Sequence, residues 1–281
     1  MKPKTFAEQI QYFSPTVPVN VRWRCGEISG YPLHYHPEYE FQFVKQGQGT
    51  YIIAGKPYHY NPGHLIIIRP DQIHSFISKS ACKMKKGRLQ FKCEWMDNIL
   101  KQLNFDDMPS PLICLTDKQA ILVEMILNRI LEENLSRADR WEDMIYYFVH
   151  EFLILIHRAR KQCVRTTRVN PIADQLCQYI ATNYADPKCT VTAVARRFGY
   201  SLSYLSALFK EVNQIGMKSY LLQYRIIVAR QLLETDPELK IMAIAKQVGF
   251  KQYGGFHRVF LMQTGMTPLS YRKFYHQDRK K

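Results

Sequence analysis

Three side chains near the N-terminus stand at a spacing that can bind a transition metal. In the segment HYHPEYEF, residues 34–41, His34 and His36 are two positions apart and Glu40 follows four positions later. Alternate residues of a β-strand point to the same face, so the three side chains would converge if the segment is extended. Imidazole and carboxylate groups suit Fe, Mn, Ni, Cu or Zn. The first hypothesis is therefore a metal site, and with it a metalloenzyme.

The chain around these residues has the pattern of short strands. From Val19 to about Trp95, glycine- and proline-rich turn signals separate apolar or alternating runs. The strand candidates are EFQFVK (40–45), TYIIA (50–54), HLIII (64–68) and RLQFKCEW (88–95). Turns this frequent predict an all-β barrel or sandwich, which we assign to residues 1–97.

After this region the hydrophobic period changes to that of helices. Apolar residues recur at helical spacing in 117–134 and 142–161, which predicts a helical pair within residues 98–161. A stripe along the second helix serves either core packing or a homodimer seam. Its members are Trp141, Ile145, Phe148, Phe152 and Ile156.

Charge is unevenly distributed along the chain. Lys and Arg outnumber Asp and Glu by 39 to 24, and residues 168–281 alone hold 17 against 7. An excess of this size favours an anionic partner such as nucleic acid. The segment 162–170 is basic and predicts an exposed linker before a last domain of residues 171–281.

Targeting and cysteine signals are weak. The N-terminus lacks a signal-peptide core and no apolar run approaches the ~18 residues that would cross a bilayer, so we expect a cytoplasmic protein without membrane contact. The seven cysteines form no CxxC pair, which predicts reduced thiols.

The last domain contains an internal repeat. TVTAVARRFGY (190–200) and KIMAIAKQVGF (240–250) align at a shift of 50, with Gly199 matching Gly249. Small residues allow helices to cross closely, and glycine suits the left-handed residue that ends a helix in a tight turn. Each copy therefore predicts a helix-turn-helix, and two copies in a basic domain point to DNA.

An uninterrupted helical segment, residues 217–234, separates the two copies. Such a helix is about 27 Å long at ~1.5 Å per residue. It could hold two recognition helices in successive major-groove segments, roughly 34 Å apart.

These residues resemble the AraC family of bacterial transcription regulators over residues 171–275. The motifs that carry the resemblance are SLSYLSALFK (201–210), SYLLQYRIIVARQLL (219–233), IAKQVGF (244–250) and FHRVFLMQTGMTPLSYR (256–272). Toward the N-terminus, HYHPEYEFQFVKQG (34–47) and RPDQIHSF (69–76) resemble the two motifs of a cupin-type sensor domain, the second supplying His74. The resemblance implies a two-domain α+β chain: a cupin or jelly-roll barrel with a helical pair, then an all-α double helix-turn-helix domain.

The resemblance also assigns DNA contacts to the start of each recognition helix. The base-contact positions that match are Ser203, Ser206 and Ala207 in the first copy, and Tyr253, Gly254, His257 and Arg258 in the second. By their chemistry, Ser201, Ser203, Lys210 and Lys251 suit phosphate oxygens, and Tyr204 is included among the DNA-binding residues. Arg258 is the residue expected to read a base, because a guanidinium bonds bidentately to guanine, and a phosphate contact is the alternative for it. Gly254 and Gly255 depart from good helix formers, so either the helix starts late or its backbone approaches a phosphate.

For the barrel, the resemblance leaves three interpretations open. The polar side chains contact a small organic effector, hold a divalent metal, or are satisfied within the protein. The effector set is His34, His36, Glu40, Tyr51 and His74, and the metal set is His34, His36, Glu40 and His74. Effector contact is the leading interpretation, with a sugar-like molecule as the expected ligand because tyrosines are frequent nearby.

The sequence thus predicts an effector-controlled, sequence-specific DNA-binding regulator that is not an enzyme and needs no cofactor. A homodimer and a contact with RNA polymerase are expected from the resemblance. Two alternatives stay open: a metal-dependent cupin enzyme, such as a dioxygenase or isomerase, tethered to DNA, and an architectural DNA binder that ignores sequence.

Overall fold

The structure, a computed structural model, describes most of the chain and divides it into two compact units. The described residues are 17–27, 30–78, 83–108, 110–160, 171–213 and 215–278. One unit is made mainly of residues 11–169 and the other of residues 170–281. All strands of the described residues lie in the first unit, and the second is helical.

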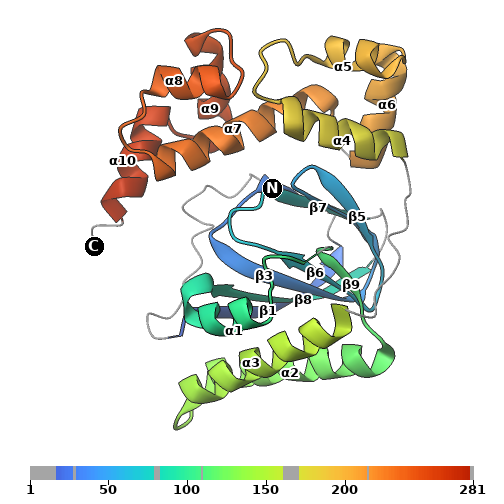
Figure 1. The fold of residues 1–281 in the computed structure, drawn as a ribbon, viewed down its shortest axis with the longest axis vertical. Coiled ribbons are helices and arrows are strands. Elements are labelled where there is room, and N and C mark those ends of the chain that lie inside the picture. The colour runs from blue at the N-terminus through green and yellow to red at the C-terminus, as the bar shows by residue number, and fades with distance from the viewer. Residues whose placement is uncertain are drawn as a thin grey trace. The chain divides into compact units, whose positions relative to one another are not determined.

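The first unit is built on two antiparallel sheets (Figure 1). The five-stranded sheet has the order β1 (Val19–Glu27), β8 (Lys83–Lys92), β3 (Glu38–Gln46), β6 (His64–Ile68) and β9 (Leu112–Cys114). The four-stranded sheet has the order β2 (Gly30–His34), β7 (His74–Ser78), β4 (Gly49–Ile53) and β5 (Lys56–Tyr60). The predicted strand over 88–95 was too long at its end, because Cys93–Met96 form a 3-10 helix that leads into α1 (Asp97–Gln102).

The five-stranded sheet has two different faces, because neighbouring residues of a strand point in opposite directions. Odd-numbered residues of β3, Tyr39, Phe41 and Phe43, belong to a large apolar core outside the barrel. The same core takes Leu89 and Phe91 from β8. We call this side the outer face.

The inner face of the same sheet looks toward the four-stranded sheet. Here Val44, Ile66 and Met84 pack against Tyr51 and Phe76 in a second, smaller apolar core. At the other positions of the inner face the side chains are polar, and these build the site described below.

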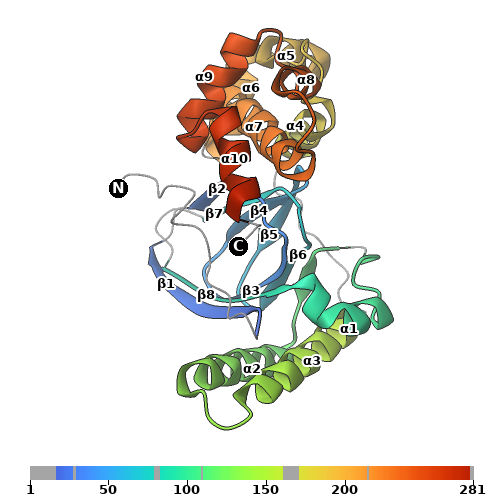
Figure 2. The same cartoon turned by 90° about the vertical axis from the view of Figure 1, so that its left-hand side faces the viewer.

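Two helices cover the outer face: α2 (Asp117–Ser136) and α3 (Trp141–Arg160) lie side by side against the sheet (Figures 1 and 2). The Thr116 side chain caps α2 by accepting a hydrogen bond from the backbone N–H of Gln119. The stripe predicted on α3 is buried in the outer core, with Ile145, Phe152 and Ile156 fully buried. Core packing is therefore the outcome for this stripe, and the seam interpretation was wrong.

The second unit consists of seven helices in its described residues. They are α4 (Pro171–Asn183), α5 (Val191–Phe198), α6 (Leu202–Asn213), α7 (Met217–Thr235), α8 (Ile241–Gln247), α9 (Tyr253–Thr264) and α10 (Pro268–Asp278). The pairs α5–α6 and α8–α9 are the two helix-turn-helix copies. Gly199 and Gly249 follow the first helix of each with φ of 72° and 86°, as predicted, and at Gly249 a Cβ would lie 2.4 Å from the Tyr184 carbonyl oxygen.

Helix α7 packs into both copies. Its first half packs Tyr220 edge to face against Phe209 of α6, and its second half contributes Ile226 and Leu233 to the core shared with α8 and α9. Arg225, in the middle, donates to the backbone carbonyl oxygens of Tyr184, Asp186 and Cys189, at 2.8–3.3 Å. Its role is structural, through hydrogen bonds to backbone carbonyl groups.

Among the helices of the described residues, none is long and apolar enough to cross a membrane. The fold class expected from the sequence is confirmed: a β-barrel-like domain with a helical pair, followed by a double helix-turn-helix domain.

Candidate functional site

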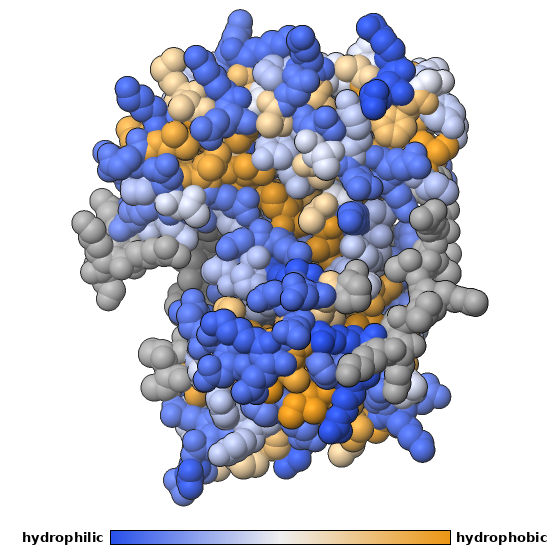
Figure 3. Space-filling model, viewed as in Figure 1, coloured by the Kyte–Doolittle hydropathy of each residue, from blue (hydrophilic) through white to orange (hydrophobic). Residues whose placement is uncertain are grey.

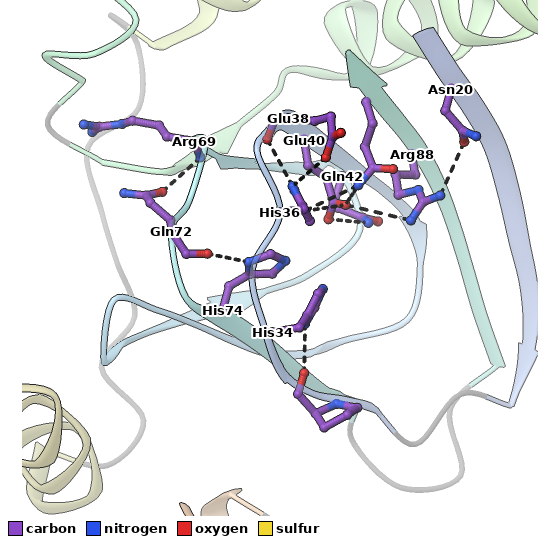
Figure 4. A network of polar contacts seen from close by, with 12 residues as sticks. Asn20, His34, His36, Glu38, Glu40, Gln42, Arg69, Gln72, His74 and Arg88 are labelled. Atoms are coloured by element: carbon purple, nitrogen blue, oxygen red, sulfur yellow. Dashed lines mark hydrogen bonds and ion pairs between the residues drawn. The ribbon is translucent and has the colours of Figure 1, made fainter. Parts of the chain in front are cut away.

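Three of the predicted site residues form one cluster inside the first unit (Figure 4). His34, His36 and His74 bring one ring nitrogen each to within 4.8 Å of the others. His34 ends β2 and stands directly opposite His74, the first residue of β7. His36 lies in the connection between β2 and β3 and not, as expected, on a strand with His34.

Backbone carbonyls orient all three rings. Nδ1 of His34 lies 2.8 Å from the Pro32 oxygen, and Nδ1 of His74 lies 2.8 Å from the Gln72 oxygen. Nδ1 of His36 lies 3.1 Å from the Glu38 oxygen. When Nδ1–H donates to a carbonyl, Nε2 keeps its lone pair for an incoming group. His34 and His74 are thus held with Nε2 as their accepting atom, whereas Nε2 of His36 lies against the Glu40 carboxylate.

Glu40 stands outside this group of possible ligands. It reaches the cluster from β3, on the opposite sheet, and its Oε2 is 3.3 Å from Nε2 of His36. Gln42 donates to its carboxylate at 2.9 Å, and Gln90 donates a further hydrogen bond. The structure therefore brings the three histidines together but engages Glu40 in a separate buried network with amide side chains.

Electrostatics separate the histidines into two kinds. Burial, with the neighbouring histidines, lowers the pKa of His34 well below its ordinary value and that of His74 to about 4. Burial also opposes protonation of His36, but its hydrogen bond to Glu40 and the charge there outweigh burial and raise its pKa. His34 and His74 are therefore neutral at pH 7, whereas His36 is the one that favours the charged form.

Among the buried polar atoms of the described residues that have no hydrogen-bond partner, two lie near this cluster in side chains predicted to bind the effector. One is Nε2 of His74 and the other is the hydroxyl of Tyr51, a side chain only 1% exposed. Buried polar atoms are nearly always paired in folded proteins, so each of these is free to bind a ligand group. Both belong to residues that the sequence assigned to effector binding.

A set of basic residues on the inner face was missed by sequence reasoning. Arg22 and Arg24 of β1 stand directly opposite Arg88 and Lys86 of β8. We call these four residues the cationic block. Lys86 and Arg88 are only 3% and 7% exposed. Their alternation with Leu89 in the sequence predicts that they share one face of a strand, but not that this face is buried.

Lys86 lies among aromatic rings. Its Nζ is 3.7 Å from the ring centre of Phe76, 4.3 Å from that of Tyr60 and 4.8 Å from that of Tyr51. It also donates to the Tyr60 hydroxyl at 3.1 Å. Burial lowers the pKa of Lys86 to about 7, since the ring faces and one hydroxyl replace water only in part.

In the second unit, the predicted DNA-binding positions of the first copy lie on the surface of α6. Its packing side is formed by buried Leu205 and Phe209. The predicted residues Ser201, Ser203, Tyr204, Ala207 and Lys210 are exposed, and Ser206 is half-buried. Ser201 also caps the helix, because its hydroxyl accepts from the backbone N–H of Tyr204 at 3.2 Å.

The second copy presents its predicted positions in the same way on α9. Phe256 and Phe260 form the packing side. Lys251, Tyr253, Gly254 and Arg258 are exposed, and His257 is half-buried. Helix α9 begins at Tyr253, so both Gly254 and Gly255 are helical, and the expectation of a late helix start was wrong.

Comparisons with known proteins match a domain model to each of the two units. Residues 24–140 match the family model described as "AraC-like ligand binding domain", and residues 194–273 match the model described as "Helix-turn-helix domain". The two matches together span most of the chain. The chain belongs to the AraC family. It is a transcription regulator with a ligand-binding domain and a helix-turn-helix DNA-binding domain.

This AraC-family chain is similar to the following proteins of known name. The HTH-type transcriptional activator RhaR of Salmonella arizonae is 25% identical over 253 residues, which cover 87% of this chain and 88% of RhaR. The solved C-terminal domain of AraT, a response regulator of Geobacillus stearothermophilus, is 30% identical over 38% of this chain and 88% of that one, with a TM-score of 0.37. A structure of ToxT from Vibrio cholerae matches 90% of this chain and 97% of its own at 14% identity, with a TM-score of 0.35.

Proposed function

We propose that this regulator is a transcription activator switched by a small molecule that binds at the histidine cluster of the first unit. The observation that carries the proposal is the pair of unpartnered buried atoms, Nε2 of His74 and the Tyr51 hydroxyl, inside a ligand-binding domain. A ligand that bonds these atoms stabilises one arrangement of the two sheets over others. Regulation then requires that this arrangement binds DNA with a different affinity.

Activation is proposed because the RhaR relative is a transcriptional activator. A contact with RNA polymerase is part of the same proposal. We also propose a homodimer, because apolar side chains are exposed on the helical pair away from the outer core. Leu122 and Tyr147 line a groove there with Ile154 and Leu155, and Met125 is 53% exposed. Apolar patches also interrupt the hydrophilic surface in Figure 3.

Catalysis and a resident metal are not part of the proposed function. His34 and His74 fit a metal, because each has Nδ1 on a carbonyl and Nε2 directed to the cluster. The third and fourth predicted ligands fit less well. Nε2 of His36 lies 3.3 Å from Oε2 of Glu40 and 3.4 Å from Nε2 of Gln90, so a metal would have to compete with these contacts for that ring nitrogen. We therefore favour an organic effector over a metal enzyme.

The DNA half of the proposal is tested by selection of duplexes from a random pool with the full chain. We expect a consensus with two segments about one helical turn apart. Selected DNA without any consensus, and an affinity set only by salt, would support the architectural alternative.

The effector half is tested by a thermal-shift screen of sugars, organic acids and divalent metals on the full chain, followed by DNA-affinity measurements with each compound that binds. His74→Gln is expected to abolish the shift, whereas His64→Gln on β6, outside the cluster, serves as the matched control. Stoichiometric metal in the purified protein, with turnover lost in His74→Gln, would overturn the proposal in favour of the enzyme.

A further inference from the structure

The register of β1 and β8 places like charges opposite each other. Arg22 faces Arg88 and Arg24 faces Lys86, in neighbouring positions of one antiparallel pair. All four belong to the inner face, since Val21 and Leu89, at alternate positions, pack in the outer core. Like charges directly opposite each other destabilise a sheet. The cationic block is therefore an arrangement that folding alone does not favour.

The negative charge facing the block is small. Glu40 is the acid whose charge acts on Arg22, Lys86 and Arg88, and its Oε2 lies 3.9 Å from Nη1 of Arg88. The same carboxylate is shared with His36 and two glutamine amides. Within the described residues, Arg22, Arg24 and Lys86 have no ion pair with an acid, so positive charge is in excess on a face with little access to water.

The pKa values of the basic groups reflect this excess. Burial is the main cause that lowers the pKa of Arg88 to about 10, and the charges of Arg22 and Arg24 lower it further. For Lys86, burial and the charge of Arg24 act in the same direction, against Glu40. Tyr51 and Tyr60, from β4 and β5, are the remaining titratable groups that face Lys86.

A second, independent observation points to a ligand at the same place. The Tyr51 ring stands 4.8 Å from Nζ of Lys86, and its buried hydroxyl has no partner among the described residues. Burial raises the pKa of this hydroxyl well above its ordinary value, so it remains a donor. An unpaired donor beside uncompensated cations suits an anionic oxygen.

We propose that the cationic block and the Tyr51 hydroxyl bind the anionic group of the effector, a carboxylate or a phosphate on a small organic molecule. This inference rests on the proposed function, because it names the chemical class of the molecule that switches the regulator. A neutral sugar would leave the block uncompensated. DNA phosphates are excluded as occupants by the burial of Lys86 and Arg88 on the inner face.

The test compares matched neutral and anionic probes on the full chain. Glucose, glucuronate and glucose 6-phosphate form one set, and benzamide and benzoate form another. We expect at least one anion to raise the thermal midpoint above its neutral counterpart, and Lys86→Met to weaken the affinity for it at least tenfold. The glucuronate and phosphate arms separate the two sources of anionic oxygen.

Lys85→Met is the control, since it removes the same charge from the adjacent residue, which contacts Trp23 on the outer face. If this variant weakens anion binding as much as Lys86→Met does, the anion binds elsewhere and the proposal fails. It also fails if every neutral probe stabilises the chain as well as its anion does. If Lys86→Met does not fold, the loss of anion affinity is measured in Arg24→Gln, a second variant of the cationic block.

DNA affinity measured in the same samples separates this inference from the proposed function. If an anion binds but DNA affinity does not change, the anion site is supported and its role as the effector site is contradicted. A neutral probe that changes DNA affinity through the histidine cluster would keep the effector role and overturn the anion site.

Discussion

The candidate site residues point into the interior in the first unit and out to the surface in the second. In the first unit the histidine cluster and the cationic block face inward, and the most buried members are less than a tenth exposed. In the second unit the predicted DNA contacts, such as Tyr204 and Arg258, point outward from helices whose other side is packed. A small ligand can be enclosed and desolvated inside a domain, whereas a DNA duplex is too large to enclose and binds to a surface.

This difference sets what a substitution does in each unit. An inward-facing charge is desolvated, so its removal changes both stability and binding. An outward-facing side chain is solvated before DNA arrives, so its removal changes binding with little effect on stability. The following predictions test that contrast, beginning with the largest effect.

Phe41→Ala should destabilise the first unit by about 3–5 kcal/mol, because Phe41 is 1% exposed and packs on Phe91 and Phe152. Denaturant unfolding followed by tryptophan fluorescence reports this unit alone, since all three tryptophans pack in or against the outer core. Phe260→Ala is the counterpart in the second unit and should move the helical circular dichroism signal while the fluorescence transition stays. A shift of both signals by either variant would show that the units do not unfold independently.

Lys86→Met should stabilise the unliganded chain by on the order of 2–4 kcal/mol at pH 6. The folded chain holds the pKa of Lys86 at about 7, below its ordinary 10.5, so the unfolded chain binds the proton more tightly between these values. Stability of the parent chain therefore rises with pH in that window, and the gain in the variant shrinks as pH increases from 7 to 9. Thermal unfolding at pH 6, 7, 8 and 9 measures the difference, and a gain that does not shrink contradicts the assignment.

Arg258→Ala should leave thermal stability unchanged and cost about 1–3 kcal/mol of discrimination at one base pair of the selected DNA site. Lys210→Ala is the matched comparison, because an exposed lysine that contacts phosphate should weaken binding to all sequences alike. Competition binding with single-base variants of the site measures both. Equal losses on every sequence for Arg258→Ala would assign that residue to the backbone of DNA.

Gly254→Ala should have the smallest effect on stability, a gain of up to ~1 kcal/mol. A Cβ at this position meets nothing within 4 Å in the protein, and the residue is helical. The glycine therefore has no packing reason, and we expect the added methyl group to weaken DNA binding by obstructing a phosphate. Gly255→Ala, at the half-buried neighbour, is the control. Unchanged DNA affinity in Gly254→Ala would remove close backbone approach as the explanation.

Much of the fold followed from local pattern. The strands over 40–45, 50–54 and 64–68 and both helix-turn-helix copies were predicted from alternation, turn signals and a repeat, which are visible within a few dozen residues. The histidine cluster was partly predictable, because spacing identified His34 and His36. The geometry that brings His74 opposite His34 depends on pairing of β2 with β7, some forty residues apart in the chain.

The cationic block shows where sequence reasoning ended. Arg22 and Arg24 lie more than sixty residues before Arg88 and Lys86, so only the register of β1 on β8 makes them neighbours. Each segment alone reads as an ordinary strand with solvated basic residues on one side. Which side is buried was decided by α2 and α3, which cover the apolar face and leave the basic one to the interior. The fate of Glu40 has in part the same origin, since Gln90 meets it only through the pairing of β3 with β8, whereas Gln42 is its neighbour two positions along β3.

Helix α7 has a consequence for the promoter that this regulator reads. The two halves of this helix are packed into different helix-turn-helix copies, and Arg225 at its middle is hydrogen-bonded to backbone carbonyls. The protein itself therefore fixes the distance between α6 and α9. Inserting one base pair between the two recognised segments turns them by roughly 35° relative to each other, since B-DNA repeats every 10–10.5 base pairs. The base composition of the intervening DNA should therefore be free to drift, while its length is held constant.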